Sequence, residues 1–277
     1  MRTVQAFPAQ AAMWRQVNVT FADWPSAGRT AAEHLGPILA CAEDDRLIAS
    51  WFFVRKFPAW RVRYLTAPDA PPDAGSRVTD ALHSLMNGPH VTAVREVVYE
   101  PETCAFGGRK GMDNAHRLFH ADSRHLLARL ASGDRPAPDR SRELTLILMV
   151  VMLRGAGLDW YEQGDVWARV AVHRPNHAQS CSSQRLDSVR RYLTADTESA
   201  LGDGSPLDVS PGWGQAFGTA GADLAMLSSA GLLHRGLRAV LAHHVVFTWN
   251  RHGLPYDTQA LLASSARDAI FGADPTT

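Results

Sequence analysis

The sequence predicts an α+β protein in which an antiparallel sheet from the N-terminal half is packed by a mostly helical C-terminal half. Segments with alternating apolar and β-branched residues occur within the first 100 residues, whereas the later apolar segments have helical spacing. The chain has 277 residues and no visible internal repeat. We therefore expect one domain spanning residues 1–277.

The first half supplies the strands. Alternation and β-branched residues predict strands over 14–21, 47–53, 61–65 and 91–99. A helix over 26–42 follows a serine that can cap it, and a second helix is predicted over 78–86. The segment 67–76 holds three prolines and is expected to be a loop.

The second half is predicted to be helical. Apolar periodicity indicates helices over 113–130, 143–153, 161–172, 186–192, 222–233, 237–249 and 258–271. The polar, proline-containing segment 132–141 is expected to be a linker. The pair Asp122-Ser123 is typical of a helix start, where either side chain can act as a cap.

Composition narrows the function classes. The 28 basic side chains balance the 28 acidic ones, so neither a nucleic acid nor an anionic membrane is the expected partner. The longest apolar run, 146–153, is far shorter than the roughly 20 residues that span a bilayer. The N-terminus lacks the apolar segment of a signal peptide. We expect a soluble, cytoplasmic protein.

The densest cationic stretch is Arg55 to Tyr64. Arg61 and Arg63 are two residues apart on a predicted strand, so both point to one face of the sheet. Two guanidinium groups on one face can receive a carboxylate or a phosphate, and a solvated strand face is the alternative. The aromatic neighbours Trp60 and Tyr64 are expected to belong either to the core or to the lining of a peptide site.

Glu102 leaves a strand and enters a turn rich in glycine. A partly buried carboxylate there can act as a general acid or base, whereas an exposed one would do nothing. Gly107, Gly108 and Gly111 do not match a nucleotide-binding loop, although Arg109 beside them could hold an anion.

Histidines supply the remaining titratable candidates. His116 and His120 share a helix face and could bind zinc, but no motif adds a third ligand, so packing is the simpler interpretation. His243 and His244 point about 100° apart on a helix, so at most one of them faces a given cleft. No motif implies a metal or another cofactor.

An acidic and aromatic segment precedes the helix predicted over 161–172. Asp159 and Tyr161 there are candidates for substrate binding. Acidic residues favour helix N-termini in any case, so a purely structural role is the alternative.

Four stretches, 51–64, 99–124, 157–170 and 243–254, together resemble the thiopeptide-type bacteriocin biosynthesis proteins. These proteins are stand-alone relatives of the C-terminal elimination domain of lanthipeptide dehydratases. The resemblance covers Trp14 to about Gly253. It implies that the chain modifies a leader-bearing precursor peptide made on the ribosome.

The resemblance also implies a reaction and a set of residues. In the elimination domains, glutamate is expelled from a glutamylated Ser or Thr, which leaves a dehydroamino acid. Arg61 and Arg63 match the family's arginine pair, and Glu102 matches its glutamate. The family's next arginine is missing here because that position is Ala105, and either Arg109 or no residue replaces it. His244, or its neighbour His243, is the candidate for the family's C-terminal histidine.

Two other functions stay open at this point. Pyridine synthases of the same family join two dehydroalanines in a formal [4+2] cycloaddition and expel the leader peptide. A noncatalytic leader-binding subunit is the third hypothesis, since a sheet edge can accept a peptide strand. The expected partners are a precursor peptide and, for the elimination reaction, a glutamylating dehydratase partner protein.

Overall fold

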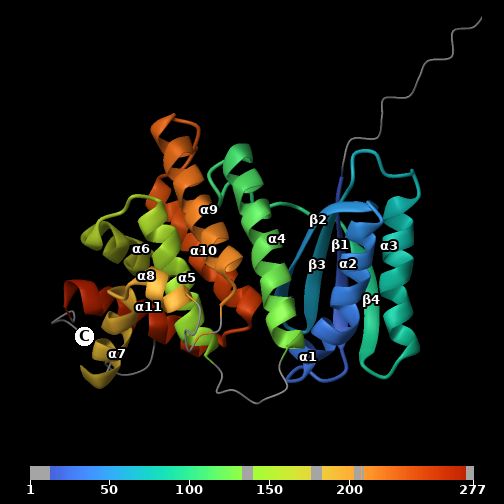
Figure 1. The fold of residues 1–277 in the computed structure, drawn as a ribbon, viewed down its shortest axis with the longest axis horizontal. Coiled ribbons are helices and arrows are strands. Elements are labelled where there is room, and N and C mark those ends of the chain that lie inside the picture. The colour runs from blue at the N-terminus through green and yellow to red at the C-terminus, as the bar shows by residue number, and fades with distance from the viewer. Residues whose placement is uncertain (1–12, 133–139, 176–182, 203–206, 208, 273–277) are drawn as a thin grey trace, which may run out of the picture. The chain divides into compact units, whose positions relative to one another are not determined.

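The computed structural model describes residues 13–132, 140–175, 183–202, 207 and 209–272 (Figure 1). The chain divides into two compact units. Unit 1 comprises residues 1–100 with 126–133, and unit 2 comprises residues 101–125 with 134–277. The predicted α+β class is confirmed, because the antiparallel sheet lies in the N-terminal half and helices dominate the C-terminal half.

Unit 1 is built on a four-stranded antiparallel sheet with the strand order β2-β3-β1-β4. The strands are β1 (Trp14–Phe21), β2 (Ile48–Lys56), β3 (Ala59–Thr66) and β4 (Val91–Val97). All four predicted strands are confirmed, with small shifts at their ends. Strands β2 and β3 form a hairpin, and β1 lies between β3 and β4.

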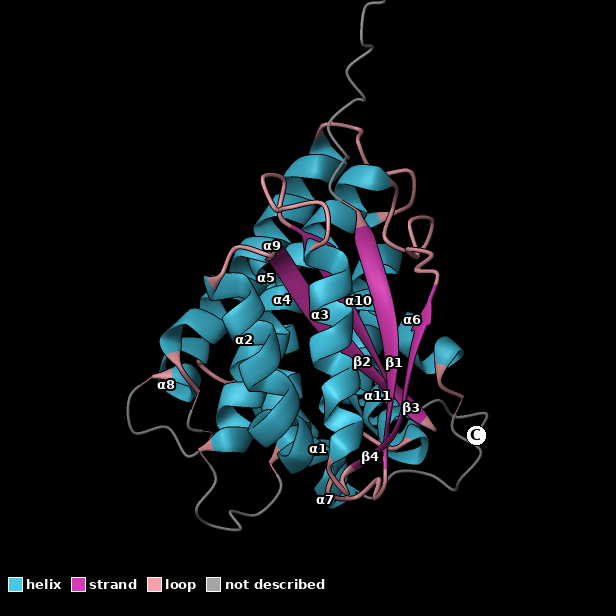
Figure 2. Cartoon of the chain, turned by 90° about the vertical axis from the view of Figure 1, so that its right-hand side faces the viewer, coloured by secondary structure: helices cyan, strands magenta, loops and turns pink. Residues whose placement is uncertain are grey.

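Helices of unit 1 cover one face of this sheet. They are α1 (Ala27–Thr30), the π-helical turn η1 (Ala31–Leu35), α2 (Gly36–Asp44), α3 (Ala74–His83) and the 3-10 turn η2 (Ser84–Asn87). Helices α2 and α3 lie over the same sheet face in both views (Figures 1 and 2). The Tyr64 hydroxyl donates to the carbonyl oxygen of Gly75 at 3.0 Å, which attaches β3 to α3. The predicted loop over 67–76 is wrong at its end, because α3 begins at Ala74.

Unit 2 is helical. Its helices are α5 (Ser141–Gly155), α6 (Trp160–His173), α7 (Ser183–Leu193), α8 (Thr197–Leu201), α9 (Pro211–Ser229), α10 (Leu237–His252) and α11 (Tyr256–Phe271). Helix α4 (Arg109–Ala131) begins in unit 2, and its last residues belong to unit 1. Helix α5 packs against α9 and α10, and α6 packs against α10 and α11. No helix within the described ranges combines the length and apolarity that a bilayer crossing requires.

In this half, one helix lies elsewhere than predicted and another was not predicted. Helix α9 begins at Pro211 and ends at Ser229, although the periodicity placed it over 222–233. Glycines early in the segment lower its intrinsic helix propensity, and packing against α5 overrides that preference. The short helix α8 had no predicted counterpart. The predicted linker over 132–141 lies mostly outside the described residues.

Candidate functional site

The arginine pair of β3 lies on a polar strip of unit 1. The strand register places Arg63 opposite Gln16 and Arg61 opposite Asn18, so these four side chains share the sheet face opposite to Tyr64, whose hydroxyl contacts α3. Arg63 Nε donates to Gln16 Oε1 at 2.8 Å, and Gln16 Nε2 donates to Asn18 Oδ1 at 3.0 Å. Hydrogen bonding therefore fixes the orientation of Arg63 before any ligand arrives.

Aromatic rings complete the surroundings of Arg63. Its guanidinium carbon lies 4.4 Å from the ring centroid of Tyr99 and 5.3 Å from that of Phe52. Trp14 packs edge-on against both rings. Arg63 is 3% exposed, whereas Arg61 is only partly buried. A stacked, hydrogen-bonded guanidinium in such surroundings is rigid.

The aromatic residues that flank the pair lie on the opposite face. Trp60 and Tyr64 are both fully buried beneath the helices of unit 1. Trp60 stacks on Phe53 with ring centroids 4.6 Å apart, and the Tyr64 hydroxyl meets Thr79 Oγ1 at 2.7 Å. These contacts explain both residues as part of the core, which is one of the two alternatives that the sequence left open. We assign neither residue a contact with substrate.

Glu102 opens the glycine turn of unit 2. Its carbonyl oxygen accepts from the backbone N–H groups of Ala105 and Phe106, at 3.0 and 3.2 Å. The turn closes through Gly107 and Gly108, whose φ angles of 81° and 103° favour glycine. The Glu102 side chain is partly buried. Arg109, the first residue of α4, is exposed.

His244 lies on α10 in an aromatic cage. Its ring centroid is 4.9 Å from that of Phe106 and 5.9 Å from that of Phe119. Within the described ranges neither ring nitrogen has a hydrogen-bond partner. Burial, and to a smaller extent the charges of Arg251 and His243, lower the pKa of His244 to about 3. The imidazole is therefore neutral at physiological pH.

His243 has different surroundings on the same helix. It is half-buried, and Arg235 Nη1 lies 2.8 Å from its Nε2. Burial, followed by the charge of Arg235, lowers the pKa of His243 to about 4. Of the two neighbouring histidines, His243 is the one that solvent reaches.

The other predicted site residues of unit 2 lie at a helix start. Asp159 is the N-cap of α6, where its carboxylate accepts from the Glu162 backbone N–H at 2.8 Å in a reciprocal capping box. Tyr161 is 66% exposed and stacks on Phe271. The capping box accounts for Asp159 without a substrate.

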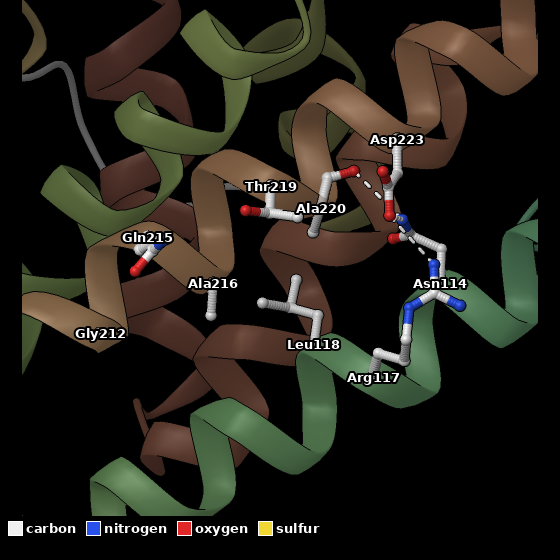
Figure 3. A pocket seen from close by; sticks show the side chains of 9 residues that line it. All are labelled: Asn114, Arg117, Leu118, Gly212, Gln215, Ala216, Thr219, Ala220 and Asp223. Carbon is white, nitrogen blue, oxygen red and sulfur yellow. Dashed lines mark hydrogen bonds and ion pairs between the residues drawn. The ribbon is translucent and has the colours of Figure 1, made fainter.

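A pocket of about 300 Å³ lies between residues of α4 and α9 (Figure 3). Its walls are Asn114, Arg117, Leu118, Gly212, Gln215, Ala216, Thr219, Ala220 and Asp223. At one end Asp223 accepts from Arg117 Nη2 at 3.0 Å. This ion pair closes the pocket with charges that neutralise each other.

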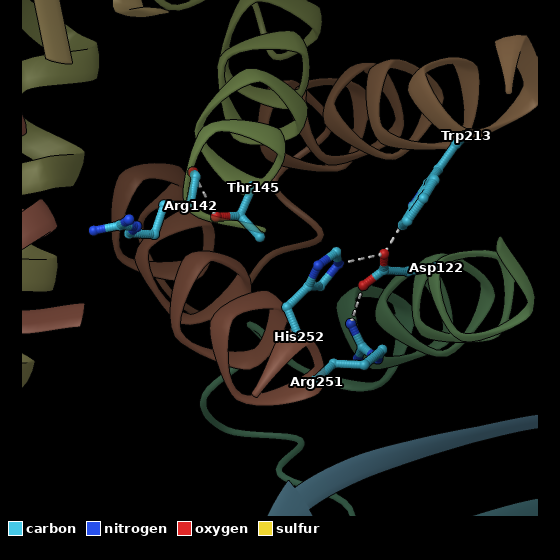
Figure 4. Close-up of polar contacts among 6 residues, drawn as sticks. All are labelled: Asp122, Arg142, Thr145, Trp213, Arg251 and His252. Carbon is cyan, nitrogen blue, oxygen red and sulfur yellow. Dashed lines mark hydrogen bonds and ion pairs between the residues drawn. The ribbon is translucent and has the colours of Figure 1, made fainter. Parts of the chain in front are cut away.

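A buried polar cluster links three helices of unit 2 (Figure 4). The Asp122 carboxylate of α4 accepts from Trp213 Nε1 of α9 at 2.8 Å and from Arg251 Nη1 of α10 at 2.5 Å. His252 Nε2 lies 3.1 Å from the same carboxylate. Burial alone would raise the pKa of Asp122, but His252 and Arg251 outweigh it and lower the pKa to about 2.

This cluster corrects the interpretation of Asp122-Ser123 as a helix start. Both residues lie in the middle of α4 and are 0% exposed. A signal was present in the sequence, because Asp122 falls on the apolar face that Leu118, Phe119 and Leu126 define at helical spacing. A carboxylate at such a position needs a buried partner.

The histidines of α4 do not form a metal site with their described neighbours. His116 is 8% exposed, and His125 Nδ1 lies 2.8 Å from the Ser210 hydroxyl. In the part of the chain that the structure describes, no three His, Cys, Asp or Glu side chains are grouped as metal ligands.

Comparison with known proteins identifies the family. The family model described as "Lantibiotic biosynthesis dehydratase C-term" matches residues 14–270. The chain belongs to this family. No curated protein sequence matches it significantly.

Solved structures of related fold include both large and small proteins. The tRNA-dependent lantibiotic dehydratase MibB from Microbispora sp. 107891 is similar over 96% of this chain, with a TM-score of 0.64 and 15% identity. The chain spans only 29% of that protein's length. TsrL is similar over 96% of this chain and 99% of its own, with a TM-score of 0.58 and 16% identity.

A third structure has a stated activity. TbtD, the pyridine synthase from thiomuracin biosynthesis, is similar over 93% of this chain and 97% of its own, with a TM-score of 0.55 and 14% identity. At these identities the likeness establishes the fold. Membership of the lantibiotic dehydratase C-terminal family supports a role in the maturation of a ribosomally made peptide.

Proposed function

We propose that this protein is an enzyme that eliminates glutamate from glutamylated Ser or Thr residues of a leader-bearing precursor peptide. Besides family membership, one observation carries the proposal: Arg61 and Arg63 share a sheet face, and Gln16 and Tyr99 hold the Arg63 guanidinium in place. A fixed pair of guanidinium groups suits a reaction that releases a carboxylate.

The reaction requires a base and an anion receptor. A base removes the α-proton of the modified residue, the C–H electron pair forms the Cα=Cβ double bond, and the bond from Cβ to the ester oxygen breaks. Glutamate departs as a carboxylate. In the proposal the β3 arginine pair stabilises that developing charge, and Glu102, which matches the family's glutamate, accepts the α-proton.

The C-terminal histidine has a restricted role in this scheme. His244 is fully buried and enclosed by Phe106 and Phe119, so a substrate cannot reach it for proton transfer. His243 is more accessible. We therefore assign any proton transfer by this pair to His243 and a packing role to His244.

Mass spectrometry of a glutamylated precursor peptide tests the proposal. Adding the protein is expected to convert glutamyl adducts into dehydrated peptide. Arg63→Gln and Arg61→Gln are each expected to lower kcat by about 10²–10³, because each removes one charge-assisted contact from the transition state. Arg77→Ala, which removes an exposed arginine from α3, is the matched control and should leave the rate unchanged.

Two results would contradict the elimination reaction. One is persistence of the glutamyl adducts with wild-type protein. The other is unchanged dehydration in the Arg61 and Arg63 variants together with Glu102→Gln. If product formation in the complete pathway still needs the protein although these variants act like wild type, the leader-binding subunit becomes the better hypothesis.

Pyridine formation is the second candidate, and a specific observation favours it. In the family pattern of the elimination domains an arginine follows the glutamate, and that position is Ala105 in this chain. A synthetic peptide with two dehydroalanines is the direct test, because cyclisation with loss of the leader supports this candidate and recovery of intact linear peptide excludes it.

A further inference from the structure

Two arginines and two histidines lie together on the surface of unit 2. His173, at the end of α6, and His243, on α10, have ring centroids 4.8 Å apart. Arg235, in the segment before α10, places its Nη1 2.8 Å from His243 Nε2. Arg174 follows His173 directly and caps the end of α6. We call these four residues the α6–α10 cluster.

The described carboxylates do not pair with the arginines of the cluster. Among the described residues, neither Arg174 nor Arg235 forms an ion pair with a carboxylate, although Arg238 on the same helix α10 pairs with Asp165 at 3.1 Å. The two arginines also help to lower the pKa values of both histidines, after the larger effect of burial. Like charges held together without a counter-ion attract an anion from solution.

Neutral contacts hold the two arginines in place. Arg174 Nε donates to Gln259 Oε1 at 2.8 Å, and its Nη1 donates to the His173 carbonyl oxygen at 2.9 Å. Arg235 is held by its contact with a neutral His243. Each guanidinium therefore has further N–H groups available while its position is already set, which lowers the entropic cost of binding a ligand.

The cluster lies next to the turn that carries Glu102. The backbone N–H of His234, the residue before Arg235, donates to the Gly107 carbonyl oxygen at 2.8 Å. The Phe106 and His243 rings also contact each other, with centroids 6.3 Å apart. Both contacts lie within unit 2.

We propose that the α6–α10 cluster is a binding site for a carboxylate, with Arg235 and Arg174 as its principal contacts. The fork of an arginine matches the two oxygens of a carboxylate. The choice of ligand rests on the proposed elimination, so we expect the ligand to be the glutamate that the reaction releases. An acidic side chain of the precursor peptide presents the same chemistry, so the experiment separates these two sources.

Binding is measured by NMR titration of the intact protein with three probes. L-glutamate represents the released product, N-acetyl-glutamate methylamide represents an acidic peptide residue, and N-acetyl-glutamine methylamide lacks the carboxylate. We expect the ring signals of His173 and His243 to shift with at least one of the first two probes and not with the third. The tighter of the two binders identifies the source.

Arg235→Gln supplies the mutational test. It is expected to weaken binding of the carboxylate probe by about 10- to 100-fold, because one charge-assisted contact is lost. Arg238→Gln, three residues later in the chain and already paired with Asp165, is the control and should bind like wild type. In wild type, the bound carboxylate should raise the pH at which the His243 ring titrates, an effect that a purely structural role for Arg235 would not produce.

Several outcomes would overturn the carboxylate site. These are shifts with all three probes alike, no shift with any probe, or equal affinity in the Arg235→Gln and Arg238→Gln variants. The test needs no turnover. Carboxylate binding without elimination would contradict the proposed function but support this site. Elimination without carboxylate binding at the cluster would support the proposed function but contradict this site.

Discussion

At the scale of single residues, Asp122 has the most demanding surroundings in unit 2. Asp122, Arg251 and His252 have fully buried side chains. The Asp122 carboxylate therefore compensates the positive charge of Arg251 inside the fold. A buried charge that loses its partner costs much more than a surface pair is worth. The cluster therefore stabilises the junction of α4, α9 and α10.

Asp122→Asn is expected to lower the free energy of unfolding by about 3–5 kcal/mol, since it removes the buried carboxylate charge that pairs with Arg251. Urea denaturation followed by tryptophan fluorescence measures the change. Asp223→Asn is the matched control, because its partner Arg117 is 65% exposed and a surface pair contributes about 1 kcal/mol or less. Equal losses in the two variants would contradict the role assigned to Asp122.

Residue patterns predicted some side-chain positions and not others. Alternation placed Arg61 and Arg63 on one sheet face correctly, because the side-chain period of a strand is fixed. The partners of Arg63 could not be predicted, because both are far from it in the sequence. Gln16 lies on β1, and Tyr99 follows the end of β4. The roles of Arg61, Arg63, Glu102 and His244 in a reaction stay predictions.

At the scale of elements, the contact between α5 and α9 depends on glycine. A Cβ atom added to Gly221 would lie 2.1 Å from the Met152 carbonyl oxygen, and one added to Gly155 would lie 2.5 Å from the Gly218 carbonyl oxygen. The two backbones therefore approach more closely than side chains would allow. Gly218 and Gly221 also lower the helix propensity of α9 before residue 222, so propensity alone does not predict a helix there. The close packing that they allow against α5 is not visible in the local sequence.

Gly221→Ala is expected to reduce the free energy of unfolding by about 1–3 kcal/mol, because the methyl group would force α5 and α9 apart. Gly218→Ala, three residues earlier on α9, is the matched control. Its Cβ would meet only Val151 Cγ1 at 3.5 Å, so better helix propensity should stabilise this variant by up to about 1 kcal/mol. Thermal unfolding of both proteins decides the matter, and equal destabilisation would refute the close approach.

At the scale of the whole molecule, local patterns gave the class and most element positions but not the topology. The order β2-β3-β1-β4 depends on β1 accepting β3 on one side and β4 on the other, and no local period encodes that choice. The division into two units likewise depends on contacts between segments far apart in sequence. The prediction of one domain over residues 1–277 therefore stays a prediction.

The pH dependence of unfolding follows from His244. Its pKa is about 3 in the fold, whereas an unfolded histidine titrates near 6.5. Between these values the unfolded chain binds more protons, so the free energy of unfolding falls as the pH drops below about 6.5. His243 adds an effect of the same sign down to about pH 4. Near pH 2 to 4, protonation of Asp122 removes further stability, because its pKa is depressed in the fold.

His244→Phe isolates the contribution of His244, because phenylalanine fills the aromatic cage and cannot titrate. Between pH 4.5 and 6.5, the stability of this variant should fall less steeply than that of wild type, by at most about 1.4 kcal/mol per pH unit. Protection factors of the α10 amides from hydrogen exchange report the stability of this helix directly. Above pH 7 the two proteins should have parallel profiles, since His244 is neutral in both states there. Parallel profiles at lower pH as well would mean that solvent protonates this imidazole in the native state.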